Sequence, residues 1–368
     1  DEYKLSSVSG IGYMQAEKIT ESVLEKYDYN LSEVLIIDKK KIKFRVRNDI
    51  VSFNFDSMAI APLKVHNQIE GFLFVARKSD SRFESEDKKA IAAYADYAAI
   101  ALENAKLIKE SLEKERLEKE MEVAREIQYK LLPNKIPSFK DLEISAVFIP
   151  AFEVGGDYYD FFEVGEKNLA FVVADVSGKG ISAAFIMAEI KGIFESLSKT
   201  ISQPKVLLNY ANDIINQSLE KKYFVTAIYG IIDMQNGKLT FGRAGHTPLH
   251  LFRDNSVKRL RPNGIGLGLD HGNKFASTLE EMEIQLNNND ILILYSDGIT
   301  EAQNGINEEF GYDKLDTIVT ENWRKNASEI SNEIIKNVTT FSKDKAQHDD
   351  ITLVVFKSNF NNKQIEVG

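Results

Sequence analysis

The chain has 368 residues, 43% of them hydrophobic, a formal net charge of -10 and no cysteine. This length and apolar content predict two packed domains rather than a disordered protein, and the lack of cysteine excludes disulfides, thiolate nucleophiles and iron–sulfur centres. The negative charge disfavours binding to nucleic acid or an anionic membrane, so a protein partner is the better expectation.

The N-terminal region predicts a small sensor or dimerisation domain over residues 1–102. Its first residues, DEYKLSS, are neither a signal peptide nor a start methionine, which is typical of a fragment. Strand candidates lie at 31–37, 57–63 and 69–76, and the last two predict a hairpin. The stretch from MAIAPL to ENAKL (58–107) resembles the C-terminal half of a GAF domain. That resemblance implies a partial sensory module, and a dimerisation platform without a ligand remains an equal alternative.

A long helix is predicted to follow, from residue 86 to residue 132, with residues 103–133 as a coiled-coil linker. Small or apolar residues recur at alternating steps of three and four, at Ile91, Tyr94, Ala98, Ala101, Ala105, Ile108 and Leu112. The repeat then shifts phase, and Pro133 is the first firm stop. We expect a homodimer formed through this helix and the N-terminal domain, in which two helix packings compete. A rigid monomeric spacer is the simpler alternative.

Four aspartates in distinct settings dominate the rest of the chain. They are Asp157 in VGGDYYD, Asp175 in FVVADVSGKG, Asp297 in ILILYSDGITEA and Asp349 in QHDDITLVVF. Each borders an apolar run typical of a buried strand, so a sheet could bring all four to one edge. Carboxylates without cysteine or a histidine pair suit Mg²⁺, Mn²⁺ or Ca²⁺ rather than zinc. Any one of these segments alone would more often be an ordinary turn, so the prediction depends on their coincidence.

Several nearby signals are weaker. The run SGKGIS lacks the spacing of a nucleotide-binding P-loop. Its glycines instead predict a tight turn into a helix beginning near Ile181, whose amide groups could help to hold an anion. His246, in AGHTP, is interpreted as a hydrogen-bonded turn residue rather than an acid or base. The other histidines, which show no metal spacing, are His66, His250, His271 and His348.

The order of VGGDYYD, DVSGKG, AGHTP, YSDGITEA and DDITLVV resembles the bacterial PPM serine/threonine phosphatases of the SpoIIE/RsbU type. The resemblance covers about residues 122–357 and includes REIQYKLLP (125–133), FVTAIYG (224–230) and GLGL (266–269). It implies an α+β fold with a four-layer αββα sandwich over 134–358, followed by a tail at 359–368. Helical segments near 181–199, 203–220 and 327–342 would cover the sheets.

The resemblance also implies the residues of the site. Asp175 would bridge two Mn²⁺ or Mg²⁺ ions, with the carbonyl of Val176 completing one coordination sphere. Asp297 and Asp349 would hold the other ion, and Asp157 would bind a metal directly or through water. Two further residues, Asp350 and Gly156, would support these ligands from behind.

A water activated by the two metals would be the nucleophile, with Asp157 and Asp175 as the catalytic carboxylates. Eukaryotic members of the wider family have a histidine two residues after the bridging aspartate, where this chain has Ser177. The proton for the leaving group must therefore come from elsewhere, and Lys179 and metal-bound water are both candidates.

The function that the resemblance implies is hydrolysis of phosphoserine or phosphothreonine on a partner protein, regulated by the N-terminal domain. The implied substrate is a phosphorylated STAS-domain anti-sigma-factor antagonist in a partner-switching pathway. A catalytically silent scaffold that binds the phosphorylated partner, and a phosphatase for small molecules, are the alternatives. No apolar run approaches the roughly 18 residues of a membrane span, so we expect a cytoplasmic protein.

Overall fold

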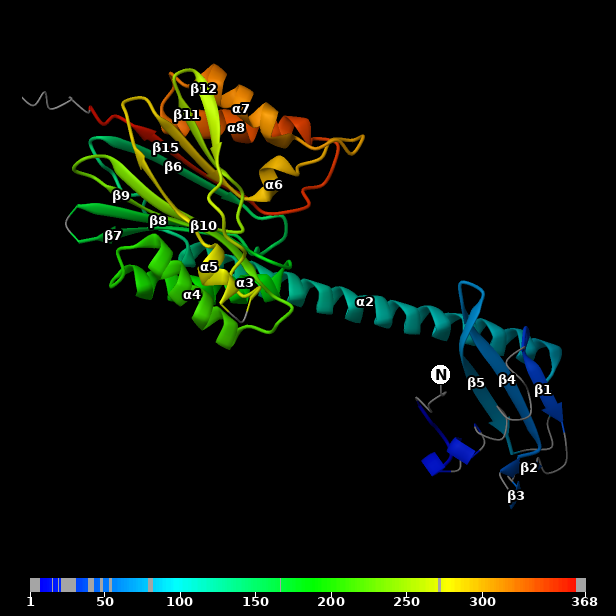
Figure 1. The fold of residues 1–368 in the computed structure, drawn as a ribbon. Coiled ribbons are helices and arrows are strands. Elements are labelled where there is room, and N and C mark those ends of the chain that lie inside the picture. The colour runs from blue at the N-terminus through cyan, green and yellow to red at the C-terminus, as the bar shows by residue number, and fades with distance from the viewer. Residues whose placement is uncertain are drawn as a thin grey trace, which may run out of the picture. The chain divides into compact units, whose positions relative to one another are not determined.

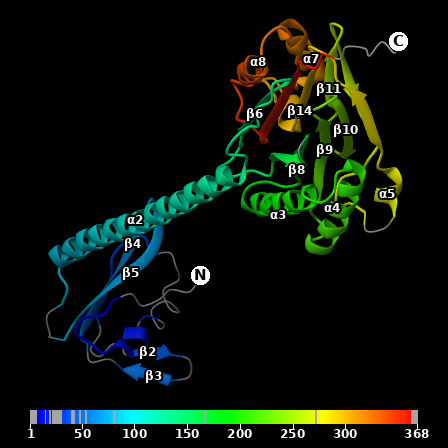
Figure 2. The same cartoon turned by 90° about the vertical axis from the view of Figure 1, so that its left-hand side faces the viewer.

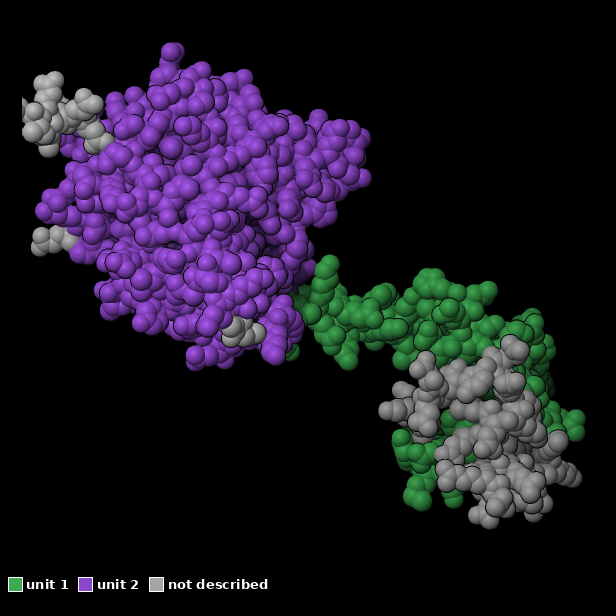
Figure 3. Space-filling model, in the orientation of Figure 1, with its two compact units in different colours: residues 1–117 green, residues 118–368 purple. Residues whose placement is uncertain are grey.

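The computed structural model describes residues 7–361 apart from 15, 19, 21–30, 39–42, 47–48, 53–54, 79–81, 166 and 271–272, so His271 lies outside the described residues. Its contacts divide the chain into two compact units, residues 1–117 and residues 118–368 (Figure 3). Within the described residues, no helix combines the length and the apolar character needed to cross a membrane.

The first unit contains a three-stranded antiparallel sheet in the order β1-β4-β5, and a separate two-stranded hairpin of β2 and β3. The bounds are β1 (Leu35–Asp38), β2 (Lys43–Val46), β3 (Asp49–Ser52), β4 (Ser57–Val65) and β5 (Gln68–Arg77). The predicted hairpin is confirmed as β4 and β5, which turn at His66 and Asn67, both with positive φ.

Helix α2 (Ser85–Leu131) is continuous for 47 residues and confirms the predicted helix to within one residue at each end. Its first turns pack on β4, because Ile91, Ala95 and Ala99 are buried in one cluster with Ala59 and other residues of that strand. Most of the large apolar side chains beyond this cluster are exposed, among them Ile100, Leu102, Leu107, Ile108, Leu112, Leu117, Val123 and Ile127.

The second unit is built on two five-stranded sheets in which every neighbouring pair is antiparallel. One sheet, in the order β13-β10-β9-β8-β7, consists of β7 (Tyr158–Val164), β8 (Asn168–Val176), β9 (Val225–Asp233), β10 (Lys238–Ala244) and β13 (Glu281–Gln285). The other, in the order β12-β11-β14-β15-β6, consists of β6 (Leu142–Ile149), β11 (Leu249–Arg253), β12 (Ser256–Leu260), β14 (Ile291–Tyr295) and β15 (Ile351–Ser358).

Helices cover the outer faces of both sheets, which completes the four αββα layers that the sequence predicted (Figures 1 and 2). Helices α3 (Ile181–Ser198) and α4 (Pro204–Ser218) lie on the first sheet, and α7 (Gly311–Asn322) and α8 (Ala327–Phe341) lie against the second. Three of these match predicted segments to within two residues, whereas α7 was not predicted. Two short helices, α5 (Lys274–Thr278) and α6 (Asp297–Thr300), complete the unit.

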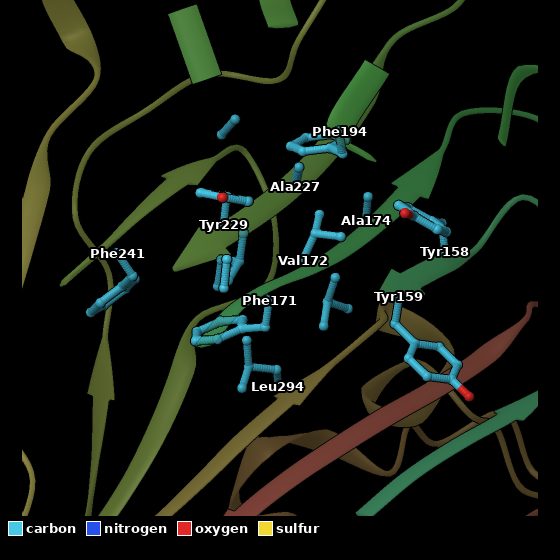
Figure 4. Close-up of a cluster of buried hydrophobic side chains, with 14 of the residues drawn as sticks. Tyr158, Tyr159, Phe171, Val172, Ala174, Phe194, Ala227, Tyr229, Phe241 and Leu294 are labelled. Atoms are coloured by element: carbon cyan, nitrogen blue, oxygen red, sulfur yellow. The ribbon is translucent and has the colours of Figure 1, made fainter. Parts of the chain in front are cut away.

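The main core lies between the two sheets. The rings of Phe171 on β8 and Phe356 on β15 are 5.1 Å apart, and Figure 4 shows Leu294 of the second sheet close to Phe171. On the outer face of the first sheet, Phe194 of α3 stacks on Tyr229 of β9 at 5.9 Å. Burial on both faces explains why these strands are nearly continuous apolar runs.

Candidate functional site

The first sheet brings Asp157 and Asp175 together. Tyr158 on β7 pairs with Ala174 on β8, so the same register continued by one residue places Asp157 opposite Asp175. Paired residues of an antiparallel ladder have their side chains on the same face, about 4.5–5.5 Å apart at Cβ. The two carboxylates are therefore neighbours at one end of the sheet.

The second sheet contributes three more aspartates. Asp297 is the first residue of α6 and is separated from the end of β14 by Ser296 alone, while Asp349 and Asp350 come immediately before β15. The ladder continues past the end of β14, where the Ser296 amide donates to the Thr352 carbonyl at 3.0 Å. The two groups of aspartates meet, because the Asp350 carboxylate accepts a hydrogen bond from the Asp157 amide at 3.4 Å. The charges of Asp297, Asp349 and Asp350 accordingly raise the pKa of Asp175.

Asp157 is the most deeply buried member of this five-aspartate site. Asp157 is only 1% exposed, and its Oδ2 atom has no hydrogen-bond partner among the described residues. Burial, followed by the charges of Asp175 and Asp350, raises its pKa well above the usual range, although the hydroxyls of Ser296 and Thr352 oppose the shift. A buried ionised carboxylate oxygen without a partner is costly, and either a proton or a bound cation would neutralise it.

The pKa values of two half-exposed aspartates are raised as well. Burial and then the charges of Asp297, Asp349 and Asp350 raise the pKa of Asp175 to about 7. Burial, followed by the charges of Glu301 and Asp349, raises the pKa of Asp297 to about 6. Carboxylates this close together repel one another unless a cation lies between them.

Asp350 organises the loop that carries Asp157. Its carboxylate accepts hydrogen bonds from the amides of Ala151 at 2.8 Å, Gly156 at 2.6 Å and Asp157 at 3.4 Å. These three amides lower its pKa but do not outweigh the effect of burial, so the pKa remains raised. Asp350 is therefore committed to the main chain, as expected of a residue that supports the ligands from behind.

The two glycines of VGGD are needed for close approach. A Cβ atom on Gly155 would lie 2.0 Å from Oδ2 of Asp350, and one on Gly156 would lie 2.9 Å from the carbonyl oxygen of Val176. These contacts place the Val176 carbonyl against the loop, at the end of β8 next to Asp175. Gly156 matters because any side chain would push that carbonyl away.

Lys179 lies at the edge of the sheets where the aspartates meet. Its Nζ atom is 2.8 Å from Oδ2 of Asp349 and donates to the carbonyl of His348. The loop can place it there because Gly178 and Gly180 both have positive φ before α3 begins at Ile181, which confirms the predicted tight turn. Ser177 has a structural role, since its hydroxyl accepts a hydrogen bond from the Phe224 amide at 2.8 Å.

The side chains fit divalent cations by their chemistry. Aspartate oxygens and a main-chain carbonyl are the donors that Mg²⁺ and Mn²⁺ prefer, and the unpartnered Asp157 oxygen lies among them. Among the residues that the structure describes, no group of three or more acidic or histidine side chains is arranged closely enough to form a metal site. The donors nevertheless come from segments that meet at one edge.

The described histidines do not contribute a metal ligand group. His246 is buried and bonded to Thr226, which is consistent with its interpretation as a hydrogen-bonded residue. His250 is buried beside Asp316, with 2.7 Å between Nδ1 and Oδ1, although the angle is not that of a hydrogen bond. His66 lies 3.3 Å from Glu103 in the first unit.

The sequence analysis did not identify three residues that contribute to the site. Glu301 acts on Asp297 through its charge and was visible only as part of YSDGITEA. Thr226 lies opposite Asp175, a pairing that requires the strand register. Gln128 donates to the Gly155 carbonyl at 2.7 Å and accepts from the Gly155 amide at 3.0 Å. The motif REIQYKLLP contains Gln128, yet its pattern does not indicate a partner.

Comparisons with known proteins identify the family. The profile of the family described as stage II sporulation protein E (SpoIIE) matches residues 165–359. The chain is 31% identical over 247 residues to phosphoserine phosphatase RsbU of Bacillus subtilis, covering 66% of this chain and 71% of that protein. It is 30% identical over 272 residues to protein IcfG of Synechocystis, covering 65% of this chain and 42% of that protein.

Solved structures show the same fold. The SiaA-PP2C domain of Pseudomonas aeruginosa superposes with a TM-score of 0.60 at 19% identity, covering 66% of this chain and 98% of that one. A structure of the RsbU and RsbW domains of Rv1364c from Mycobacterium tuberculosis has a TM-score of 0.53 at 21% identity, covering 62% of this chain and 63% of that one. At these identities the likeness concerns the fold, which is that of PP2C phosphatase domains.

Proposed function

Because the chain belongs to the stage II sporulation protein E (SpoIIE) family, we propose that it hydrolyses phosphoserine or phosphothreonine on a partner protein, with two divalent cations held by its aspartates. The observation that carries this proposal is the convergence of five aspartates from two sheets at one edge. Their raised pKa values and the unpartnered Asp157 oxygen are the properties expected of a site that binds cations.

Asp175 is the best placed to bridge two ions, because it lies between Asp157 on its own sheet and the aspartates of the second sheet. The Val176 carbonyl would complete one ligand set, and Asp297 with Asp349 would hold the second ion. When bound, two Mn²⁺ or Mg²⁺ ions would activate a water as the nucleophile and neutralise charge on the phosphoryl group. Asp350 and Gly156 keep the ligand-bearing loop and the Val176 carbonyl in place.

We assign the proton for the leaving group to Lys179. Its side chain is half exposed and its ammonium group lies 2.8 Å from the Asp349 carboxylate, so it is at the solvent-accessible edge of the site. Ser177 is a poor replacement for the histidine of eukaryotic relatives, because a serine hydroxyl is a much weaker acid than an imidazolium or an ammonium group, and its oxygen accepts a hydrogen bond from the Phe224 amide. A positioned acid typically contributes a factor of about 10²–10⁴ to the rate.

The relatives support a phosphoprotein as the substrate. RsbU and RsbP of Bacillus subtilis are both named phosphoserine phosphatases. We therefore propose a phosphorylated STAS-domain protein as substrate, in a partner-switching pathway. The half-exposed positions of Asp175 and Asp349 support a phosphorylated side chain on a protein surface, because the aspartates lie within reach of solvent.

The N-terminal domain would regulate the enzyme through α2. The helix runs without interruption from the sheet of the first unit to Gln128, whose two hydrogen bonds hold Gly155. Gly155 in turn lies against the Asp350 carboxylate. A rotation or shift of α2 would therefore move the loop that carries Asp157, which gives a signal from the sensor a direct route to the cation ligands.

We also propose that α2 pairs with α2 of a second copy. Ile108 and Leu112 of the predicted repeat are 61% and 60% exposed, and Leu117 beyond the phase shift is 58% exposed. Exposed apolar side chains repeated along one helix favour a coiled coil. Replacing Ile108 and Leu112 with glutamate should convert a dimer into a monomer in light scattering after gel filtration.

The first experiment measures Mn²⁺-dependent release of phosphate from a phosphoserine STAS-domain protein. The wild-type chain is compared with Asp175→Asn and with Asp213→Asn, a matched change at an exposed position of α4. We expect release by the wild type and Asp213→Asn and almost none by Asp175→Asn, with unchanged circular dichroism. Undiminished hydrolysis by Asp175→Asn would overturn the mechanism, and release of phosphate only from small phosphate esters would overturn the substrate class.

A further inference from the structure

A row of polar side chains crosses three neighbouring strands at the site and extends beyond the aspartates. It begins with Asp157, directly before β7, and Asp175 on β8, and Thr226 on β9 is paired with Asp175. Since paired residues project to the same face, the Thr226 and Asp175 side chains are neighbours on one face of the sheet. Both residues are half buried, so this end of the row is within reach of solvent.

His246 completes the row from the loop after β10. Its Nδ1 atom is 2.8 Å from the Thr226 hydroxyl oxygen, while the residue is only 4% exposed. Its other ring nitrogen, Nε2, is buried without a hydrogen-bond partner. The hydrogen bond to Thr226 is thus the one polar interaction with correct geometry that the imidazole makes within the described residues.

The loop holds His246 in this position firmly. Arg243 donates to the His246 carbonyl at 2.7 Å, and the Thr247 hydroxyl donates to the Tyr295 carbonyl, two residues before Asp297. Gly245 has a φ of 71°, and a Cβ there would lie 2.7 Å from the Gly266 amide nitrogen. A loop constrained at three consecutive residues fixes the direction of the imidazole, and through it the direction of the hydroxyl.

The imidazole is also neutral. Burial, followed by the charge of Arg243, lowers the pKa of His246 to about 3, against a smaller opposing effect of the Tyr295 carbonyl. A neutral ring can orient the Thr226 hydroxyl without placing a positive charge beside a group of carboxylates that is proposed to bind cations. This combination suits an orienting role for His246.

We infer that Thr226, oriented by His246, is a positioning residue that sets the direction of the Asp175 carboxylate for cation binding. The inference rests on the proposed function, because it concerns the same carboxylate. The hydroxyl acts through Asp175 and does not itself contact the phosphoryl group. Partners of this kind typically change metal affinity or activity by about 10–100-fold when they are removed.

The test measures Mn²⁺ affinity by titration calorimetry on the full chain, alongside phosphate release and melting in EDTA. Thr226→Val removes the hydroxyl at nearly constant shape, and Thr226→Ser keeps it. Thr240→Val makes the same change on β10, away from the row. His246→Asn keeps a polar atom near the place of Nδ1, whereas His246→Leu does not.

We expect Thr226→Val and His246→Leu to bind Mn²⁺ at least 10-fold more weakly, with Thr226→Ser, His246→Asn and Thr240→Val close to the wild type. Thr226→Val should melt below Thr240→Val in EDTA, because the buried His246 ring loses its hydrogen-bond partner, so Mn²⁺ affinity and not melting is the deciding readout. Equal Mn²⁺ affinity of Thr226→Val and wild type would overturn this inference alone. So would equal losses in Thr226→Ser and Thr226→Val. A wild-type chain that binds no Mn²⁺ would overturn the proposed function as well.

Discussion

Gly298 lies directly against the main-chain carbonyl of Asp350, so that a Cβ atom on Gly298 would be 2.1 Å from that oxygen. The contact joins the start of α6, which carries Asp297, to the segment that carries Asp349. A main-chain atom cannot turn away as a side chain can. The glycine of YSDG is therefore required by the approach of two site segments, in addition to any preference for a turn.

Replacing Gly298 with alanine should separate these segments. We expect a clear loss of thermal stability and of Mn²⁺ affinity, because either α6 or the Asp350 main chain must move. Gly192→Ala is the matched control, since Gly192 is exposed within α3 and an added Cβ meets nothing within 4 Å. That control should be stabilised by about 0.5–1 kcal/mol. Scanning calorimetry of both variants measures the difference, and equal effects would contradict the steric argument.

Gln128→Leu should weaken the link between α2 and the VGGD loop. The change leaves the amide and carbonyl of Gly155 without their partner, and buried groups left in this way cost about 1–3 kcal/mol. Lys130→Leu, at an exposed position of the same helix, is the control. We expect a lower denaturation midpoint and altered phosphatase activity for Gln128→Leu alone. Unchanged activity with lowered stability would show that the contact is structural and does not regulate the enzyme.

Lys179→Met tests the source of the proton. We expect turnover of a phosphoserine protein to fall at least 10-fold, because a serine alkoxide is a poor leaving group without an acid. Hydrolysis of p-nitrophenyl phosphate should fall much less, since its leaving group is stable as an anion. A control at an exposed lysine, Lys205→Met, should leave both rates unchanged. Equal losses with the two substrates would assign Lys179 to phosphate binding or to positioning of Asp349 instead.

The metal-free protein should lose stability as the pH rises. The folded-state pKa of Asp175 is raised from 3.8 to about 7 and that of Asp297 to about 6, so the folded state holds protons that the unfolded chain has released. The destabilising effect of ionising these two carboxyl groups is absent at low pH, grows between about pH 4 and pH 7, and is fully present above the folded-state pKa values. In EDTA, Asp175→Asn should therefore melt above the wild type at pH 7.5, and this advantage should shrink at pH 5.

With saturating Mn²⁺ at pH 7.5, the wild type should instead melt above Asp175→Asn. Only the wild type retains the full ligand set, and binding to the folded state adds stability. Melting curves with EDTA and with Mn²⁺ at the two pH values provide the comparison. If Asp175→Asn melted below the wild type in EDTA at pH 7.5, the carboxylate would be stabilising without a metal, and the electrostatic account of the site would be wrong.

Local patterns in the sequence were sufficient for most of the architecture. The hairpin of β4 and β5, the long helix to Leu131 and the helices beginning at Ile181 and Ala327 were all predicted. Periodicity and turn residues determine such elements within a few neighbouring residues. Helix α7 was missed, although Leu315, Ile318 and Val319 have helical spacing and are buried. The αββα fold is confirmed, while the roles assigned to the four aspartates stay predictions.

The sequence by itself determined the chemistry of the site, because hard oxygen donors at strand ends already indicate a cation site. Only the tertiary structure decided which groups support those donors. Gln128 reaches Gly155 across 27 positions, and Lys179 meets Asp349 from the opposite sheet. Thr226 faces Asp175 only through the register of β8 and β9. Strand register and the packing of one sheet on another depend on the whole core, so no local pattern could contain these pairings.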